Sequence, residues 1–274
     1  MKKSAFLASF FIVVIALIPV VNSCTTVPLT GRSQVTKLIS DEQVMNMSTA
    51  AYQQVLDSVP LSTNQEQVAM IKRVGTRIQN AVEKYMADNG YASQLEGFEW
   101  EFNLIDNDTL VNAWAMPGGK VAFYTGILPI CEDELGVAVV MGHEVAHAVA
   151  KHGQERMNQA YIKGGLLAIG AAALGQDPTT SQRLVFQAVG LGADLKILSF
   201  SRKHESEADE LGLTFMAMAG YDPREAPKFW ERMSGGSKGN QRPEFMSTHP
   251  SHETRIQRLN AAMPEALKYY NGEK

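Results

Sequence analysis

The sequence predicts an α+β protein that is mainly helical and carries one small antiparallel sheet. Three observations support this class: long segments with helical spacing of apolar residues, one segment that alternates polar and apolar residues, and a turn between two strand-like pieces. With 274 residues, 45% of them hydrophobic, the chain can bury a substantial core. Its formal net charge of −4 provides no basic surface for phosphates, so no nucleic-acid partner is expected.

The N-terminus has the layout of a lipoprotein signal peptide. Two lysines precede an uncharged apolar run over residues 5–21, and the small Ser23 stands directly before Cys24. This resembles the lipobox of bacterial lipoproteins, so Cys24 is expected to carry a lipid anchor. The alternative is an uncleaved anchor helix, but Pro19 interrupts a run that is already short for a membrane span. The predicted organisation is a signal peptide over 1–23, a lipid-linked tether over 24–39, a folded domain over 40–266 and a C-terminal tail over 267–274.

Two helices are predicted at the start of the domain. Ser40 lies three residues before Gln43, a capping-box arrangement that opens a helix over 41–57. The second helix, over 64–88, repeats apolar residues on one face, and Gly90 follows as its terminator. We expect both helices to serve as scaffold.

The sheet is predicted from two neighbouring segments. FEWEFNLID (98–106) alternates as a half-buried strand does, and MPGGK (116–120) forms a turn between two further strand-like pieces. Pro117 restricts the first of these pieces to a sheet edge or a strand end. An edge strand has free backbone groups that can pair with an extended peptide, although a hairpin with only a packing role is the alternative. The predicted substrate-binding edge strand comprises Asn112, Ala113, Trp114 and Ala115.

A helix predicted over 132–151 is apolar on nearly every side but contains His143, Glu144 and His147. Residues four apart share one helix face, so both imidazoles can bind one metal ion while Glu144 lies beside it. From there a carboxylate can take a proton from the attacking water and pass it to the leaving amine. The alternative is a satisfied network of core histidines, because burying these groups without partners would be costly.

A third ligand must come from elsewhere, because a catalytic zinc has three protein ligands and one open position. A third histidine on the same helix is excluded, since Ala150 and Gly153 occupy the metzincin positions. SRKHESEADELG offers Glu205 as a ligand, with Asp209 on the same helix face to hold a ligand histidine through its second nitrogen. Glu207 is the competing ligand, but it lies on another face and lacks an acidic partner one turn on. An exposed acidic helix face is the structural alternative.

Four motifs occur in chain order: NAWAMPGGKVAFYTGIL, HEVAHAVAKH, SRKHESEAD and STHPSHETR. In kind and order they resemble the zinc metallopeptidase family that includes HtpX, the CAAX prenyl endopeptidase and the periplasmic proteases BepA and LoiP. The resemblance covers the chain from about Cys24 to Arg258. It implies a gluzincin-like domain in which the HExxH helix carries the active site. It further implies one catalytic zinc ion bound by His143, His147 and Glu205, with Glu144 as the base and Asp209 supporting a ligand.

The same resemblance assigns a role to two residues near the C-terminus. His249 would approach the metal, either to stabilise the oxyanion or to occupy the open position as an off switch, and Arg255 would organise that segment. From the residues alone, His249 can equally be a loop histidine and Arg255 a solvated helix residue. The remaining histidines, at 152, 204 and 252, are expected on the surface or behind the ligands.

The remaining segments after residue 163 say less about function. GGLLAIGAAALG (164–175) and LVFQAVGLGADLKILSF (184–200) are expected to pack as helices or to lie as a loop over the site. A flexible loop is predicted over 235–240, and Ser251 is expected to cap the final helix.

The resemblance implies an endopeptidase that cleaves unfolded or misassembled cell-envelope proteins held as an added strand. The chain lacks the several long spans of HtpX and the prenyl endopeptidase, so its domain is expected on a lipid anchor facing the periplasm of a bacterium. Thr25, in place of aspartate, favours the outer membrane, and association with outer-membrane assembly machinery is expected. The alternatives are a chaperone or assembly factor for outer-membrane proteins with minor or gated peptidase activity, and a zinc-stabilised scaffold without turnover.

Overall fold

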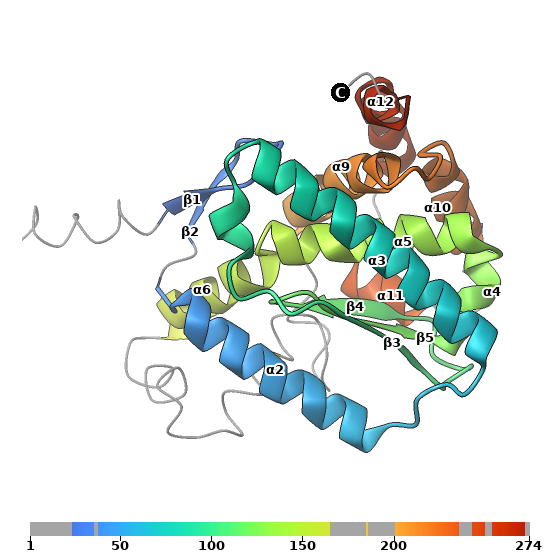
Figure 1. The fold of residues 1–274 in the computed structure, drawn as a ribbon, viewed down its shortest axis with the longest axis horizontal. Coiled ribbons are helices and arrows are strands. Elements are labelled where there is room, and N and C mark those ends of the chain that lie inside the picture. Colours follow the sequence, from blue (N-terminus) through green and yellow to red (C-terminus); the bar gives the residue numbers. More distant parts are fainter. Residues whose placement is uncertain are drawn as a thin grey trace, which may run out of the picture.

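The computed structural model describes residues 24–35, 38–164, 185, 201–235, 243–249 and 254–271. The predicted signal peptide, most of the two apolar segments between 164 and 200, the loop after Gly235, the Ser251 cap and His252 lie outside these residues. Within them the protein is mainly helical with small sheets, so the predicted α+β class is confirmed (Figure 1). None of the described helices is both long and apolar enough to cross a membrane.

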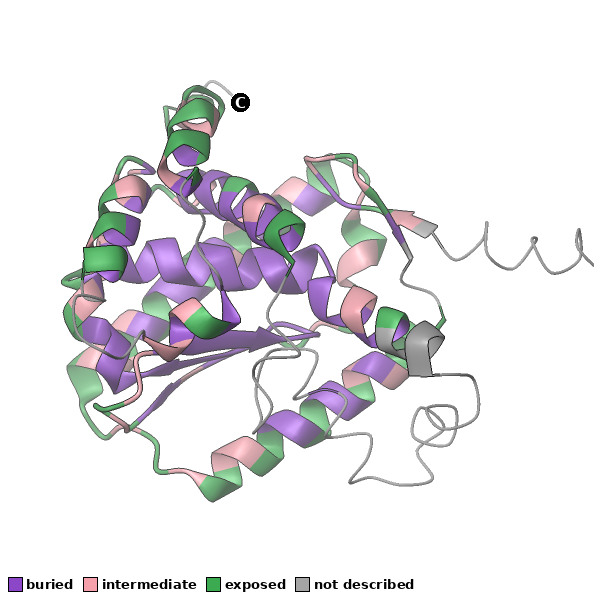
Figure 2. Cartoon of the chain, turned by 180° about the vertical axis from the view of Figure 1, so that it is seen from behind, coloured by how far each residue is buried: buried purple, intermediate pink, exposed green. Residues whose placement is uncertain are grey.

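Helices cover both faces of the main sheet (Figure 1). Helix α2 (Asp41–Ser58) packs against one face, while α3 (Gln65–Asp88) and α5 (Glu134–Val149) cover the other. Helix α9 (Arg202–Met218) packs on α5, and α12 (Arg255–Tyr270) packs on α9. Helix α5 therefore lies at the centre and is buried along almost its whole length (Figure 2). The shorter elements are η1 (Ala92–Leu95), η2 (Thr125–Ile127), α4 (Leu128–Cys131), α6 (His152–Gly164), α10 (Glu225–Gly235) and α11 (Glu244–Thr248).

The main sheet has three strands in the order β3 (Glu101–Ile105), β5 (Lys120–Tyr124) and β4 (Ala113–Met116). Strands β4 and β5 form the predicted antiparallel hairpin, whose turn requires glycine because Gly118 and Gly119 have φ of 86° and 81°. Strand β3 runs parallel to β5, so the sheet is mixed rather than wholly antiparallel. Because β5 returns between its two neighbours, β4 is left at an edge, as Pro117 predicts.

Alternation along β4 assigns its residues to two cores. Trp114 and Met116 pack with α2, whereas Ala113 and Ala115 pack with α3 and α5. The hydroxyl of Ser48 in α2 also donates to the Pro117 carbonyl at 2.6 Å. Both faces of the edge strand are therefore held in place.

Both predicted N-terminal helices are confirmed. Ser40 and Gln43 form the capping box at the start of α2, each accepting from the other's backbone N–H at 3.2 Å. Asn64 caps α3 through the N–H of Gln67, and Gly90 follows the helix with φ of 77°. The helices begin and end within one residue of their predicted bounds.

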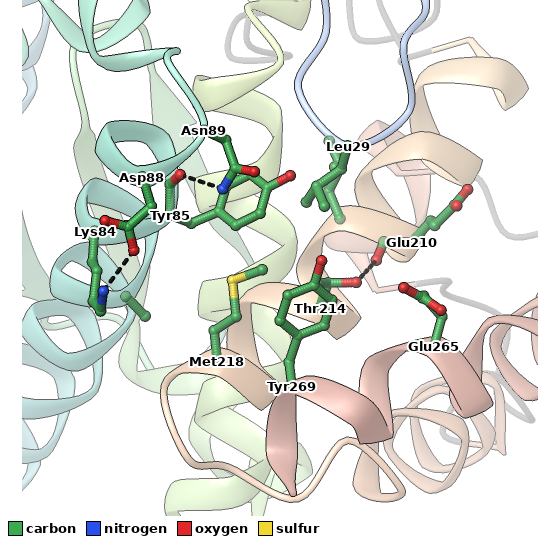
Figure 3. A pocket seen from close by; sticks show the side chains of 12 residues that line it. Leu29, Lys84, Tyr85, Asp88, Asn89, Glu210, Thr214, Met218, Glu265 and Tyr269 are labelled. Carbon is green, nitrogen blue, oxygen red and sulfur yellow. Dashed lines mark hydrogen bonds and ion pairs between the residues drawn. The ribbon is translucent and has the colours of Figure 1, made fainter. Parts of the chain in front are cut away.

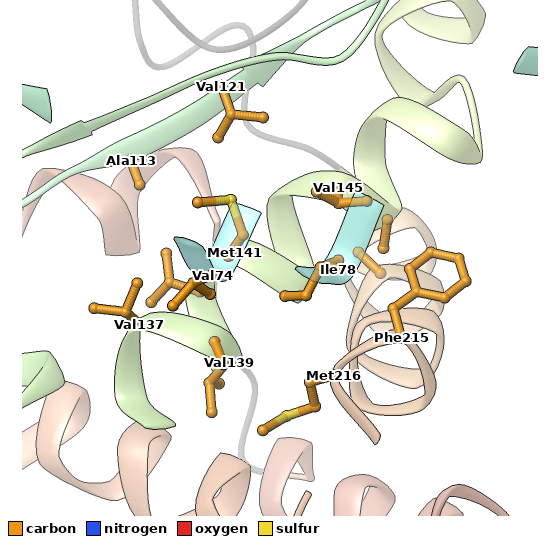
Figure 4. Close-up of a cluster of buried hydrophobic side chains, with 14 of the residues drawn as sticks. Val74, Ile78, Ala113, Val121, Val137, Val139, Met141, Val145, Phe215 and Met216 are labelled. Carbon is orange, nitrogen blue, oxygen red and sulfur yellow. The ribbon is translucent and has the colours of Figure 1, made fainter. Parts of the chain in front are cut away.

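Helices α5 and α9 cross at two glycines. A Cβ at Gly142 would lie 2.7 Å from the carbonyl oxygen of Gly212, so only glycine permits this approach. Around the crossing, side chains of α3, α5, α9 and the sheet form one apolar cluster (Figure 4). The close crossing brings the HEVAH segment of α5 next to the acidic start of α9.

The two ends of the domain differ from their predicted forms. Strand β1 (Cys24–Thr26) pairs with β2 (Ser33–Val35) as an antiparallel hairpin, so residues 24–35 belong to the folded domain and do not form a tether. The side chain of Gln34 donates to the Ala150 carbonyl at 2.8 Å, which explains why a polar segment can pack here. At the other end α12 continues to Tyr270, so the residues predicted as a tail from 267 are helical over their first part.

Candidate metal centre

Four buried side chains from three elements converge on one point. They are His143 and His147 of α5, Glu205 of α9 and His249, which follows α11, and their ligand atoms all lie within 4.8 Å of one another. The Nε2 atoms of His143 and His147 are 3.1 Å apart, and Glu205 oxygens lie 3.6 and 3.4 Å from them. None of the four residues is more than 2% exposed.

Local structure explains this convergence. His143 and His147 stand one helical turn apart on α5, and the crossing at Gly142 points that face towards α9. Ser201 caps α9 by accepting from the N–H of His204, which places Glu205 in the first turn, beside the imidazoles. The predicted preference for Glu205 over Glu207 agrees with this geometry, because Glu207 points to other partners.

The donor set fits a zinc ion. Two imidazole nitrogens and a carboxylate are the ligands that zinc takes in catalytic sites, and nitrogens 3.1 Å apart require a proton or a cation between them. Burial opposes protonation of His143, but hydrogen bonds to Asp209 and Glu205 outweigh it and raise its pKa to about 9. Burial lowers the pKa of His147 well below its ordinary value. The buried carboxylates thus favour a positive charge at the cluster, and a bound zinc ion would supply positive charge there.

Glu144 lies beside the cluster and against the edge strand. Its side chain is 1% exposed, and its Oε1 has no hydrogen-bond partner among the described residues, although His249 Nε2 lies 3.5 Å from that oxygen. Burial raises the pKa of Glu144, although the charges of His249 and His143 and a hydrogen bond from the backbone of Ala115 in β4 oppose the rise. A carboxylate oxygen without a partner at this position can accept a proton from water.

His143 is supported from the C-terminal part of the chain. Asp209 Oδ1 lies 3.0 Å from its Nδ1, and Asp209 Oδ2 accepts from Arg255 Nε at 2.7 Å. Arg255 also donates from Nη2 to Glu205 at 2.7 Å, and its guanidinium carbon lies 3.8 Å from the centre of the Trp230 ring. Arg255 is 2% exposed, so the alternative of a solvated helix residue is excluded.

His147 is supported from the opposite direction by two residues to which the sequence had not assigned this role. Its Nδ1 lies 3.0 Å from Nδ1 of His152, whose Nε2 lies 2.9 Å from Glu207. Burial lowers the pKa of His152 to about 4 against the opposing effect of Glu207, so His152 is neutral at pH 7. Burial would raise the pKa of Glu207, but hydrogen bonds, first of all to His152 and Thr30, lower it to about 2.

The sequence shows that His152 lies close to His147 along the chain, but it does not show that the two side chains face each other. His152 follows His147 by five residues, but α5 ends at Val149 and the chain turns at Lys151, which has φ of 54°. Only this turn directs His152 back at His147. His152 and His204, expected on the surface or behind the ligands, are both buried behind them, with rings stacked 4.5 Å apart.

The predicted substrate strand lies close to the cluster. Asn112, Ala113, Trp114 and Ala115 are all buried, at the edge of the described sheet and beside α5. The backbone N–H of Phe245 in α11 donates to the Val111 carbonyl at 3.0 Å, so the segment that leads to His249 starts next to β4. The cluster, the base and the edge strand therefore adjoin one another.

A large hollow of about 770 Å³ lies elsewhere, between α3, α9, α12 and the N-terminal hairpin (Figure 3). Its walls include Leu29, Tyr85, Glu210 and Tyr269, and none of the four cluster residues lines it. The hollow that His143, Asp209 and Trp230 line measures only about 10 Å³, which is room for no more than one water molecule. His249, which is 1% exposed, lies within 3.2 Å of His143 and 3.1 Å of Glu205.

Comparison with known proteins supports the interpretation of the cluster. The family model described as Peptidase family M48 matches residues 73–263. The mitochondrial metalloendopeptidase OMA1 of Schizosaccharomyces pombe is 39% identical over 176 residues, which are 64% of this chain and 50% of that protein. Its counterpart in Saccharomyces cerevisiae is 35% identical over 184 residues, covering 65% and 51%. The beta-barrel assembly-enhancing protease of Escherichia coli is 27% identical over 239 residues, covering 86% and 46%.

These matches confirm the resemblance that the four motifs indicate. The chain spans about half the length of the curated relatives it matches. The predicted location, facing the periplasm at a bacterial outer membrane, is contradicted, because the relatives at 39% and 35% identity are both named mitochondrial. A charged start and a short apolar run are shared by several kinds of targeting segment, so the pattern is weak evidence for one compartment. Lipidation of Cys24 stays a prediction.

Proposed function

We propose that this chain, which belongs to peptidase family M48, is a zinc-dependent endopeptidase whose metal is held by His143, His147 and Glu205. The observation that carries the proposal is the convergence of these three ligands with a buried Glu144 oxygen beside them, which accepts no hydrogen bond from the described residues, and an edge strand next to it. Core histidines that only satisfy one another would not leave that buried oxygen without a hydrogen bond.

The protein residues divide the reaction between them. Zinc, when bound, acts as a Lewis acid towards the water molecule and the scissile carbonyl. Glu144 takes a proton from the attacking water and passes it to the leaving amine. Its burial supports this role, because a raised pKa makes a carboxylate a better proton acceptor near neutral pH. Asp209 and Arg255 hold His143 and Glu205 in place.

Unfolded or misassembled proteins are the proposed substrates. An extended segment would add to β4 through backbone hydrogen bonds, which are available in any sequence once the segment is unfolded. The hydrogen bond between Ala115 and Glu144 supports this mode, since it places the base directly beside the strand that would bind the substrate. The buried state of β4 means that the covering segments must move before the substrate binds.

His249 is the proposed gate. Its Nδ1 lies 3.2 Å from Nε2 of His143 and 3.1 Å from Oε1 of Glu205, so it can act as a fourth ligand. Four protein ligands are typical of closed structural zinc sites, whereas a catalytic site needs an open position. Movement of the His249 side chain away from the cluster would open that position.

A Glu144→Gln variant tests the proposed chemistry. It should bind zinc as the wild type does and keep its melting temperature, but lose at least about 100-fold of its cleavage of unfolded casein, the order expected for a missing general base. Unchanged cleavage would refute the mechanism. A protein that never cleaves casein, but whose variant still prevents aggregation of unfolded proteins, would favour the chaperone alternative.

The ligand assignment has a matched control two residues away. Glu205→Gln should lower the zinc content of the purified protein far more than Glu207→Gln, because only Glu205 reaches the cluster. The reverse order would assign the ligand role to Glu207.

A His249→Ala variant tests the gate. If His249 occupies the open position, its removal should raise casein cleavage. If it stabilises the oxyanion instead, cleavage should fall by roughly 100-fold while zinc binding stays the same.

A further inference from the structure

We infer that Thr30 and Arg32 of the N-terminal hairpin position the metal ligand His147, acting through Glu207 and His152. The inference rests on the proposed function, in which His147 binds zinc. It assigns a part in the metal site to a segment more than 100 residues before the HEVAH helix.

The first step concerns the two nitrogens of His147. Nε2 faces His143 and Glu205, so Nδ1 is the nitrogen that points away from the cluster. A histidine that binds a metal through Nε2 carries its proton on Nδ1 and needs an acceptor for it. Nδ1 of His152, at 3.0 Å, is in place to accept.

The second step determines the tautomer of His152. If its Nδ1 accepts, its proton must be on Nε2, and that nitrogen lies 2.9 Å from Oε2 of Glu207. Each group in this chain then donates to the next, and the ionised Glu207 is the last acceptor. Reversal would put a proton-bearing Nε2 of His147 towards the metal, which zinc binding forbids.

The third step explains why the carboxylate of Glu207 has a fixed orientation. Both of its oxygens are engaged: Oε1 accepts from the Thr30 hydroxyl at 2.5 Å, and Oε2 accepts from Arg32 Nε at 2.6 Å. The other two nitrogens of Arg32 donate to Glu155 and to the side chain of Gln34, each at 2.9 Å. A guanidinium held at three points keeps the carboxylate in one orientation.

The hairpin that carries these residues is itself fastened to the domain. The side chain of Gln34 donates to the Ala150 carbonyl, and the side chain of Gln94 donates to the Thr26 carbonyl at 3.1 Å. Positive φ angles at Leu29 and Gly31, 67° and 66°, form the turn between the two strands and direct Thr30 and Arg32 towards α9. Because coupling is reciprocal, zinc binding should in turn stabilise the docked hairpin.

The rival explanation is that Arg32 and Glu207 only attach the hairpin to the domain. In that case removing either residue should alter the melting temperature but leave the zinc affinity unchanged. The decisive measurements are therefore the zinc dissociation constant, by competition with a chelator, and the visible absorption of the Co²⁺-substituted protein, which reports ligand geometry. The melting temperature of each metal-free variant separates these effects from unfolding.

His152→Phe should raise the zinc dissociation constant by roughly 10- to 100-fold and shift the Co²⁺ spectrum, as losing the partner of a ligand histidine does. His152→Asn should restore part of the affinity, because an amide oxygen can still accept from His147. Arg32→Ala should weaken zinc binding by about three- to tenfold, and Arg32→Lys by less. Gln94→Ala is the matched control: it removes a hairpin contact outside the chain of hydrogen bonds, so it should change the zinc affinity and the Co²⁺ spectrum much less than Arg32→Ala does.

The outcomes separate this inference from the proposed function. If His147→Ala keeps its zinc, the proposed ligand role fails. If His147→Ala loses zinc while His152→Phe and Arg32→Ala both bind it within about twofold of the wild type, only the inference is overturned. Should His152→Phe not fold, Glu207→Gln decides by the same criterion. An equal loss of zinc affinity in Gln94→Ala and Arg32→Ala would also overturn the inference, because it would show that any weakening of hairpin docking affects the metal site, whether or not the chain of hydrogen bonds is intact.

Discussion

The two histidines of the HEVAH segment are supported from opposite ends of the chain. His143 is held by Asp209 and, behind it, Arg255 of the C-terminal helix. His147 is held by His152 and, behind it, Glu207, which in turn depends on the N-terminal hairpin. Two side chains one helical turn apart thus owe their orientation to segments more than 200 residues apart.

The two supports differ in length and in burial. A carboxylate contacts His143 directly, whereas a neutral imidazole stands between His147 and its carboxylate. The side chain of Arg255 is 2% exposed and that of Arg32 is 12% exposed. The short, buried support through Asp209 and Arg255 should therefore contribute most to the stability of the fold. The longer support through His152, Glu207 and Arg32 should mainly alter zinc affinity, and the effect should decline with each further residue from His147.

The largest effect is expected from Arg255→Met. The substitution leaves Glu205 and Asp209 buried without their cation, which should lower the free energy of unfolding of the metal-free protein by about 3–5 kcal/mol in a urea titration. Arg224→Met is the control, since its ion pair with Asp222 is exposed and should contribute little. An equal, small loss in both variants would contradict the claim that the C-terminal support holds the fold.

Zinc itself should stabilise the protein next most strongly. At a free concentration 100 times its dissociation constant, it should raise the free energy of unfolding by about 2.7 kcal/mol. Magnesium should have no effect, because it prefers oxygen ligands to imidazole. Slower hydrogen exchange of the β1 and β2 amides on zinc addition would link the hairpin to the metal. Unchanged hydrogen exchange of these amides would contradict a connection between the hairpin and the metal.

Asp209 and Glu207, the two carboxylates of α9 that support the ligand histidines, should differ in their effect on zinc affinity. Asp209→Asn should raise the zinc dissociation constant by roughly 10- to 100-fold, and Glu207→Gln by less than about tenfold, because one more group separates Glu207 from its ligand. Glu210→Gln, an exposed neighbour on the same helix, should have no effect. A larger effect of Glu207→Gln would reverse the order of the two supports.

The smallest effect is expected at the far end of the longer support. Thr30→Val keeps the shape of the side chain but removes the hydroxyl that donates to Glu207, so zinc should bind no more than about threefold weaker. Thr30→Ser should behave as the wild type. A loss at Thr30 as large as that at His152 would show that the effect does not decline with distance.

Much of the site could be predicted because its signals are local. The spacing of His143 and His147 follows from the helical period, and the same period selects Glu205 with Asp209 over Glu207. Capping residues such as Ser40, and the position of Pro117 before a Gly-Gly turn, likewise act within a few residues. These features depend on backbone geometry that neighbouring residues determine together.

The sequence by itself therefore determined the class of the protein, its main helices, the edge strand and the residues of the candidate metal centre. Only the tertiary structure decided that residues 24–35 fold onto the domain, that His249 lies against Glu205 and His143, and that His152 and Glu207 join Arg32 to His147. The physical reason is that most of these contacts join residues far apart in the chain, from 44 residues for Glu205 with His249 to 175 for Arg32 with Glu207. His147 and His152 are only five residues apart, but their contact depends on the turn at Lys151. No local pattern encodes the long-range contacts, and the turn at Lys151 and the glycine crossing of α5 with α9 bring the groups together.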